Sequence, residues 1–356
     1  MIEIRFPTSS LTSEYGDIIL GSVIEKLSLE ISYNETVILE EDYFPDDNGK
    51  VVIRDIGKVA SMYFSNTDID LVNRNGIVTF TIKLTENTAP VDVVIKDVVF
   101  YLSTIDYKGT INTDQLISMP LTRSPLKSTG PGRKEYISFF GNADVTVYAV
   151  YSDGNRDVSK TLSAFNTLVS VDSIYRIDVS PEVIAGLIGC PISNLVYYSV
   201  YTNANTIVKY VMDHRGFTSK TTFIFLNNFG ATETITMIGH QVRDNSWNRE
   251  FGVVYDKMLI SSADKEDLIT VNTGYLLPGM ADVIDDLLSS KEVAVIDGDV
   301  IVPVVIIDED FKRDTHKNAP KTYEITYRVA SNTPYSKYVP LARLGVFDES
   351  FDNTFD

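Results

Sequence analysis

Val78-Thr-Phe-Thr-Ile-Lys-Leu84 alternates apolar with polar residues, and Leu27-Ser-Leu-Glu-Ile-Ser-Tyr33 repeats the pattern. A period of two places every second side chain on the same face, as in a β-strand with one buried face. Similar or continuously apolar stretches recur along the chain at residues 144–151, 195–201, 207–212, 222–226, 233–238, 293–296, 300–307 and 322–329. Together they predict a mainly β protein.

Helical patterns are few and short. Ser180-Pro-Glu-Val-Ile-Ala-Gly-Leu-Ile-Gly189 has Ser at the N-cap, Pro at the first helical position and Gly at the end, which together predict a short helix. Residues 56–64 and 279–289 predict two more. A strand pattern leads into a short helix in three places, residues 51–63, 174–188 and 268–288. We therefore expect two to three β-sandwich-like domains, each with a short helix.

Composition excludes several classes of protein. The chain has 356 residues, of which 44% are hydrophobic and 22% charged, as in folded globular proteins. Its net charge of -18 argues against nucleic acid as the main partner, because phosphate binding depends on Lys and Arg. The longest apolar runs, such as 300–307, are far shorter than the roughly 20 residues that cross a bilayer. Glu3 interrupts the N-terminus, so we expect no secretory signal and no membrane span.

Two segments divide the chain. Pro120-Leu-Thr-Arg-Ser-Pro-Leu-Lys-Ser-Thr-Gly-Pro-Gly-Arg-Lys134 is rich in Pro and Gly, so we expect a linker without regular structure. Its charged residues are all basic: Arg123, Lys127, Arg133 and Lys134. A softer boundary lies at 227–230. The predicted domains are an N-terminal β domain at 1–130, a neutral Tyr-rich β domain at 131–228, and a C-terminal β domain with a short helix and an acidic tail at 229–356.

The charges differ between these parts. Residues 1–130 carry 11 basic and 19 acidic side chains, 131–228 carry 8 of each, and 229–356 carry 12 and 22. A neutral middle between two acidic parts is suited to contact with neighbouring molecules. The acidic C-terminal tail contains Phe347, Phe351 and Phe355, whose rings can anchor it on another subunit.

No sequence pattern indicates catalysis, and we expect no cofactor and no enzyme activity. Phosphate-binding loops and the Gly-x-Ser-x-Gly elbow are absent from the sequence. Cys190, the single cysteine, ends an apolar helix and is expected to be buried and unreactive. His214 and His316 are interpreted as loop and surface residues, and His240, after a strand and Gly239, is the histidine most worth inspecting.

Acidic turns offer a weak case for calcium. The segments 40–49 and 308–310 do not follow the ligand spacing of a calcium loop, and Asp297-Gly-Asp299 reads as a hairpin turn. A glycoside hydrolase would need two placed carboxylates beside aromatic residues, and Trp247 is the single Trp. Hydrolysis of a polysaccharide therefore remains a third and weakest interpretation.

Several segments resemble structural proteins of phage tails. Two of them are Tyr210-Val-Met-Asp-His-Arg-Gly-Phe217 and Thr222-Phe-Ile-Phe-Leu-Asn-Asn-Phe-Gly-Ala-Thr-Glu-Thr-Ile235. They resemble tail and adaptor proteins of tailed phages of Bacteroides-type hosts, with crAss-like podoviruses nearest. The likeness covers residues 42–56 and 210–330. It implies a virion component, made in the host cytoplasm and repeated around the tail or neck axis.

The leading expectation is a non-enzymatic tail or neck ring or adaptor protein that forms a homo-oligomer and docks other tail proteins. The predicted contact residues are Arg123, Lys127, Arg133, Lys134, Phe347, Phe351 and Phe355. The basic residues would face acidic neighbouring subunits. The alternative is a carbohydrate- or receptor-binding adhesin or tail-fibre module, in which exposed Tyr and Trp247 stack on sugars.

Overall fold

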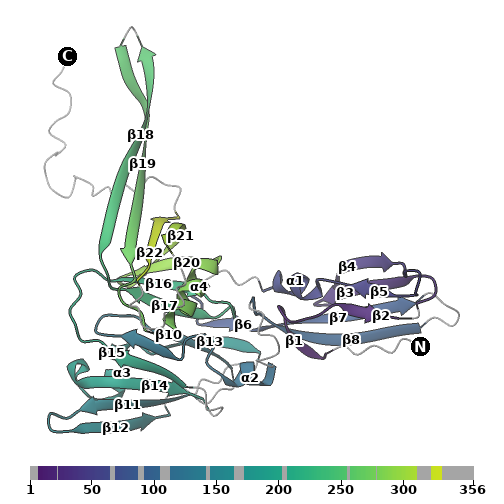
Figure 1. The fold of residues 1–356 in the computed structure, drawn as a ribbon, viewed down its shortest axis with the longest axis horizontal. Coiled ribbons are helices and arrows are strands. Elements are labelled where there is room, and N and C mark those ends of the chain that lie inside the picture. The colour runs from purple at the N-terminus through teal and green to yellow at the C-terminus, as the bar shows by residue number, and fades with distance from the viewer. Residues whose placement is uncertain are drawn as a thin grey trace, which may run out of the picture.

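The fold is mainly β, as the alternating patterns predict. A computed structural model of the chain describes residues 7–21, 23–64, 69–86, 92–104, 113–141, 145–163, 172–202, 207–254, 257–277, 279–310 and 322–330. Within these ranges the strands form five sheets, and the α-helices are four and short. Figure 1 shows an N-terminal unit that extends to one side of two further units, and a long hairpin that projects from the body.

The N-terminal unit packs a large sheet against a two-stranded one. The large sheet has the order β1 (Ser9–Leu11), β8 (Asp92–Tyr101), β7 (Ile77–Glu86), β3 (Leu27–Tyr33) and β4 (Thr36–Tyr43). The small one pairs β2 (Ile18–Leu20) with β5 (Val51–Ile53), and α1 (Ile56–Ser61) follows. The inward positions of β3 and β7, Leu27, Leu29, Ile31, Phe80, Ile82 and Leu84, are at most 1% exposed. The period of two thus produces this core.

The middle unit is also built from two sheets. The larger one has the order β12 (Asp157–Leu162), β11 (Thr146–Ser152), β14 (Leu195–Tyr201), β15 (Ile207–Met212) and β9 (Leu126–Thr129). The smaller one has the order β10 (Tyr136–Phe140), β13 (Ser173–Asp178) and β6 (Asn73–Asn75). Tyr198 and Tyr210 are fully buried between the sheets and stack with their ring centroids 4.8 Å apart.

The helix predicted at 180–189 is present in the middle unit. It is α3 (Pro181–Ile188), with Ser180 at the N-cap and Gly189 at the C-cap, and the short η1 (Ile192–Asn194) follows. Gly189 has φ 75°, a left-handed conformation that glycine adopts without strain and that ends the helix. Ile184 and Ile188 face the core.

The C-terminal unit is a seven-stranded sheet with one helix. Its order is β17 (Thr232–Met237), β16 (Thr221–Leu226), β20 (Val293–Asp297), β21 (Val300–Asp310), β22 (Glu324–Val329), β19 (Lys257–Asn272) and β18 (Gln241–Val254). The helix α4 (Met280–Ser289) packs Val283, Ile284 and Leu287 against the sheet. Asp297 and Val300 pair across the β20–β21 hairpin, which confirms the predicted turn between them.

The units share strands and core across the expected boundaries. Strand β6 comes from residue numbers within 1–130 yet pairs with β13 of the middle unit. The boundary at 227–230 is the turn between β16 and β17, which pair in the same sheet. A small cluster joins residues of all three units with α2 (Thr113–Ser118), and its buried members are Leu11, Leu116, Leu121, Phe140, Ile174, Phe229 and Ala231. The units are therefore joined by packed contacts.

Candidate functional site

The basic segment 120–134 is part of the folded core and not a free linker. Within it, β9 pairs in parallel with β15, and Lys209 donates its backbone N–H to the carbonyl of Pro125. Gly130 approaches the carbonyl of Asp213 so closely that a Cβ would lie 2.3 Å from that oxygen. The absence of an acid in the segment has a structural reason, since its basic side chains pair with acids from distant parts of the chain.

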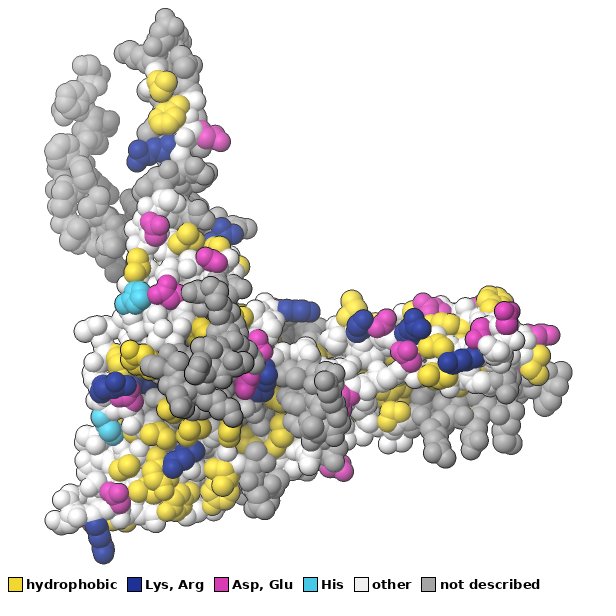
Figure 2. All heavy atoms as spheres, in the orientation of Figure 1, with side chains coloured by type: hydrophobic (Ala, Val, Ile, Leu, Met, Phe, Trp, Pro, Cys, Tyr) yellow, Lys and Arg dark blue, Asp and Glu magenta, His cyan; other side chains and the backbone are white. Residues whose placement is uncertain are grey.

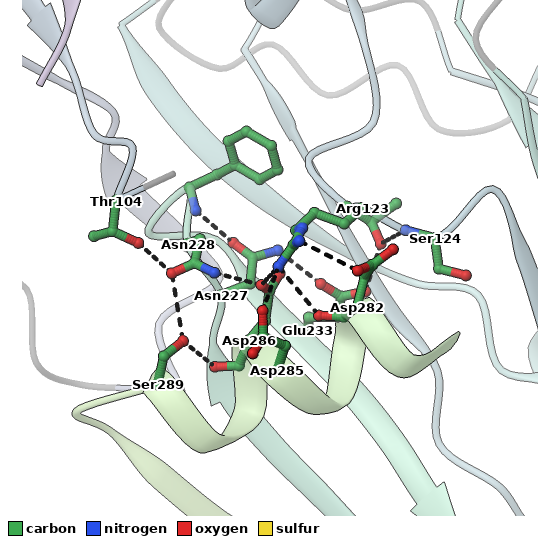
Figure 3. A network of polar contacts seen from close by, with 12 residues as sticks. Thr104, Arg123, Ser124, Asn227, Asn228, Glu233, Asp282, Asp285, Asp286 and Ser289 are labelled. Atoms are coloured by element: carbon green, nitrogen blue, oxygen red, sulfur yellow. Dashed lines mark hydrogen bonds and ion pairs between the residues drawn. The ribbon is translucent and has the colours of Figure 1, made fainter. Parts of the chain in front are cut away.

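Arg123 connects the segment to helix α4. Its guanidinium contacts three carboxylates that lie on one face of the helix, at distances of 2.7 Å to Asp286, 3.1 Å to Asp285 and 3.2 Å to Asp282. Asp286 is fully buried and also accepts a hydrogen bond from Asn228, which in turn accepts one from Thr104 (Figure 3). Burial raises the pKa of Asp286 to about 6.

Lys127 forms a second buried pair. Its Nζ lies 2.6 Å from Oε1 of Glu233, and both side chains are at most 3% exposed. Asn227 donates from Nδ2 to the other oxygen of Glu233 at 2.8 Å, and its Oδ1 accepts the backbone N–H groups of Phe229 and Ala231. The Asn that the sequence marks as a boundary therefore holds the β16–β17 turn and the ion pair together.

Glu135 is a further buried carboxylate beside Lys127. It is 3% exposed, and burial raises its pKa to about 7 against the opposing effect of the Lys127 charge. A cavity of about 10 Å³ lined by Lys127, Glu135, Thr234 and Met280 has room for about one water molecule. This cavity is too small for a substrate.

Arg133 and Lys134 differ in exposure. The Arg133 side chain is 2% exposed, lies 3.5 Å from Asp213 and stacks over the ring of Phe217. Lys134 is 44% exposed, with Asp178 at 3.8 Å. Arg123, Lys127 and Arg133 are thus engaged inside this chain and do not offer the partner-binding surface that the sequence suggested; Lys134 alone of the four is exposed. Phe347, Phe351 and Phe355 lie outside the described residues.

The histidines and the cysteine have structural surroundings. His214 places Nε2 2.7 Å from the carbonyl oxygen of Leu195, and His240 is 59% exposed with Nε2 3.4 Å from Glu324. Cys190 is half-buried at the edge of the middle core, where burial raises the pKa of its thiol. It was expected to be buried, but it follows the helix end and keeps part of its surface in solvent. His316 lies outside the described residues.

The described residues hold neither a metal-binding cluster nor a membrane-spanning helix. No group of three or more His, Cys, Asp or Glu there is arranged to hold a metal ion. None of the helices described is both long and apolar enough to span a membrane.

The hairpin β18–β19 is the most distinctive feature of the surface. Its strands pair continuously from Gln241 and Val271 out to Val254 and Lys257. Strand β22 pairs with β19 only at residues 269–272, so the pairs from Asp244 and Leu268 outward have no third strand among the described residues. We call this two-stranded part, residues 244–268, the arm (Figure 1). Residues 244–254 correspond to about 35 Å of extended chain.

The outer half of the arm has exposed apolar side chains. Phe251 is 60% exposed and Met258 is 71% exposed. Figure 2 shows hydrophobic side chains on the projecting hairpin. Met258 pairs with Val253, which lies two residues from Phe251 on the same strand. Residues two apart, and residues directly opposite, share a face of a ribbon. Phe251 and Met258 therefore lie on the same face, and a bulge beside Phe251 shifts the register there.

Comparison with protein families and with curated proteins gives no match. No family model matches the chain. No curated protein is similar to it. Among solved structures, the full extracellular region of plexin A4 is 9% identical over 94% of this chain, with a TM-score of 0.20, and this chain spans 40% of its length. The D1–D4 ectodomain fragment of ICAM-5 is 9% identical over 75% of each chain, with a TM-score of 0.19. Scores this low support no conclusion about fold or function.

Proposed function

We propose that the chain is a non-enzymatic structural subunit of a tailed-phage virion. It would act as a tail or neck ring or adaptor component that assembles in several copies and docks other tail proteins. The observation that carries the assembly role is the arm, residues 244–268. An isolated two-stranded hairpin is marginally stable in water, so a long one with exposed Phe251 and Met258 gains stability from a partner surface.

The charge of the chain supports the same role. A net charge of -18 produces self-repulsion that keeps free subunits soluble before assembly. The phage assignment is supported by the sequence resemblance, and the arm lies inside the stretch 210–330 that carries most of it.

Light scattering on the intact chain and on an arm-shortened variant tests the assembly role. In the variant, residues 244–268 are replaced by Asn-Gly, a two-residue turn that closes a hairpin between Arg243 and its partner Ile269. This keeps the pairing of β19 with β22. We expect a discrete oligomer for the intact chain from low to high micromolar concentration, and a monomer with an unchanged melting temperature for the variant. An intact chain that stays at 39.7 kDa throughout and binds no tail protein would contradict the proposal.

The phage assignment has a test of its own. Mass spectrometry of purified phage particles from a host that carries the coding sequence should detect this chain in stoichiometric amounts. Negative-stain images of the purified oligomer would then give its symmetry. Absence of the chain from the particles would show that it is not a virion component. The assembly role would then stand without the phage assignment.

A further inference from the structure

A second exposed apolar surface lies on the middle unit, on the face of its larger sheet that points away from the core. The pairing of Tyr197 with Val211, and of Tyr201 with Ile207, places these residues on that side. Ile207 is 50% exposed and Val211 is 36% exposed. We define the Tyr face as Tyr148, Tyr197, Tyr201, Ile207, Lys209 and Val211.

The Tyr face is rich in aromatic rings, and Asp157 on the neighbouring strand β12 is the acid that acts on Tyr197. The rings of Tyr148 and Tyr197 lie 6.4 Å apart, and the Nζ of Lys209 lies 3.9 Å from the centroid of Tyr197. Lys209 is the one ionic side chain among its six residues. Figure 2 shows hydrophobic side chains gathered over the middle unit on the visible side of the molecule.

The arm cannot reach the Tyr face of its own chain. In Figure 1 the arm projects from one end of the body, and strands β11, β14 and β15 lie at the opposite end. Two separate apolar surfaces on one molecule that cannot meet within it are what a head-to-tail contact between copies requires.

The net charges of the units favour the Tyr face, rather than the N-terminal unit, as the surface that binds the arm. Residues 241–272 carry 4 basic and 6 acidic side chains. Residues 1–130 have a net charge of -8, whereas residues 131–228 have a net charge of 0. An acidic arm is repelled less by the neutral middle unit, where Lys209 also supplies a positive charge.

We infer that the outer half of the arm of one copy docks on the Tyr face of a second copy. Phe251 and Met258 pack on Tyr197, Ile207 and Val211, since Met sulfur and aromatic rings attract one another and the contact removes apolar surface from water. Each copy then gives its arm to one neighbour and accepts an arm from another. The inference rests on the proposed function and adds the two surfaces that meet.

Crosslinking of mixed single-cysteine variants tests the contact directly. In a Cys190→Ser background, one chain carries Phe251→Cys and a differently sized chain carries Ile207→Cys or Val211→Cys. A short bismaleimide should join the mixed pair at least tenfold faster than it joins either variant with itself. The control is Ile95→Cys on the N-terminal sheet, which at 61% is more exposed than Ile207 or Val211 and should still react with Phe251→Cys at background rate.

Charge substitutions give a second readout. Phe251→Asp and Val211→Asp should each weaken self-association at least tenfold in light scattering, whereas Ile95→Asp should not. Rapid crosslinking of Phe251→Cys with itself would overturn the inference in favour of arm–arm pairing. Oligomers that form normally in both Asp variants would overturn it while the proposed function stands, and a chain that neither self-associates nor binds a tail protein would contradict both.

A carbohydrate ligand on the Tyr face is a distinct outcome. Oligosaccharide binding that is lost in Tyr197→Ala, together with background crosslinking, would overturn the inference and favour the adhesin interpretation.

Discussion

Glu135 and Asp286 are carboxyl groups that the fold surrounds with protein, and burial raises their pKa values to about 7 and about 6. An unfolded Glu titrates near pH 4.3, so between about pH 4.3 and 7 the folded chain holds a proton on Glu135 that the unfolded chain has lost. Stability from this group is therefore complete at low pH and decreases as pH rises through that window.

Replacement of Glu135 by Gln should remove the decrease in stability that this group causes as the pH rises. Gln has the shape of the protonated side chain, so we expect Glu135→Gln to raise the free energy of unfolding at pH 8 by about 1–3 kcal/mol and to change it little at pH 4.5. Urea unfolding at several pH values measures this. The exposed Glu25→Gln is the control, and an equal pH dependence in Glu135→Gln and the intact chain would contradict the prediction.

Arg123 should contribute more to the free energy of unfolding than Lys134, another basic residue of the same segment. Arg123→Ala leaves the buried carboxylate of Asp286 without its cation, which costs about 2–4 kcal/mol of stability. Lys134→Ala, at a side chain 44% exposed, should change stability by less than about 0.5 kcal/mol. Thermal or urea unfolding of the two variants compares them, and equal losses would show that the pairing on α4 is not what Arg123 contributes.

The sequence identifies these basic residues but not their partners. Glu233 lies 106 positions from Lys127, and Asp286 lies 163 positions from Arg123. A cluster of Lys and Arg looks the same in one sequence whether its acids come from a neighbour or from a distant helix. The sequence therefore predicts a contact surface in the basic segment, whereas in the fold Arg123, Lys127 and Arg133 pair with acids of the same chain.

At the scale of elements, the sequence predicts best those segments that have one buried face. Strands β3 and β7 are predicted correctly because their alternation shows which side is buried. Helix α3 is predicted correctly because capping residues mark its two ends. The sequence does not predict the arm, because the described side chains of the arm form no buried face. Consecutive residues at its base, Asp244, Asn245 and Ser246, are all exposed, and no alternation marks them.

Strand β9 should depend on the small size of Gly130. A Cβ at this position would lie 2.3 Å from the carbonyl oxygen of Asp213, so Gly130→Ala should separate β9 from the end of β15 and cost about 1–3 kcal/mol. Gly216 has no atom within 4 Å of such a Cβ, and Gly216→Ala is the matched control. Melting temperatures that fall equally, or not at all, would contradict the close approach as the cause.

At the scale of the whole molecule, charge opposes the proposed assembly and exposed apolar surface favours it. With a net charge of -18 on each copy, added salt screens the repulsion between copies. We expect the fraction of oligomer at fixed protein concentration to increase from about 20 to 300 mM NaCl, where the Debye length shortens from roughly 20 to 6 Å. Light scattering across this range measures it, with the arm-shortened variant monomeric at both ends. Dissociation by salt would instead indicate that ion pairs hold the copies together.

The length of the arm can change without any change in the body of the protein. It joins the body through the pairing of residues 269–272 with β22, so residues can be added or removed beyond that point without disturbing the seven-stranded sheet. A change of one residue in each strand would turn Phe251 and Met258 to the opposite face of the ribbon, whereas a change of two would keep their face and move them by about 7 Å. In the proposed assembly, insertions in multiples of two per strand would change the spacing between copies in discrete steps and keep Phe251 and Met258 on the same face.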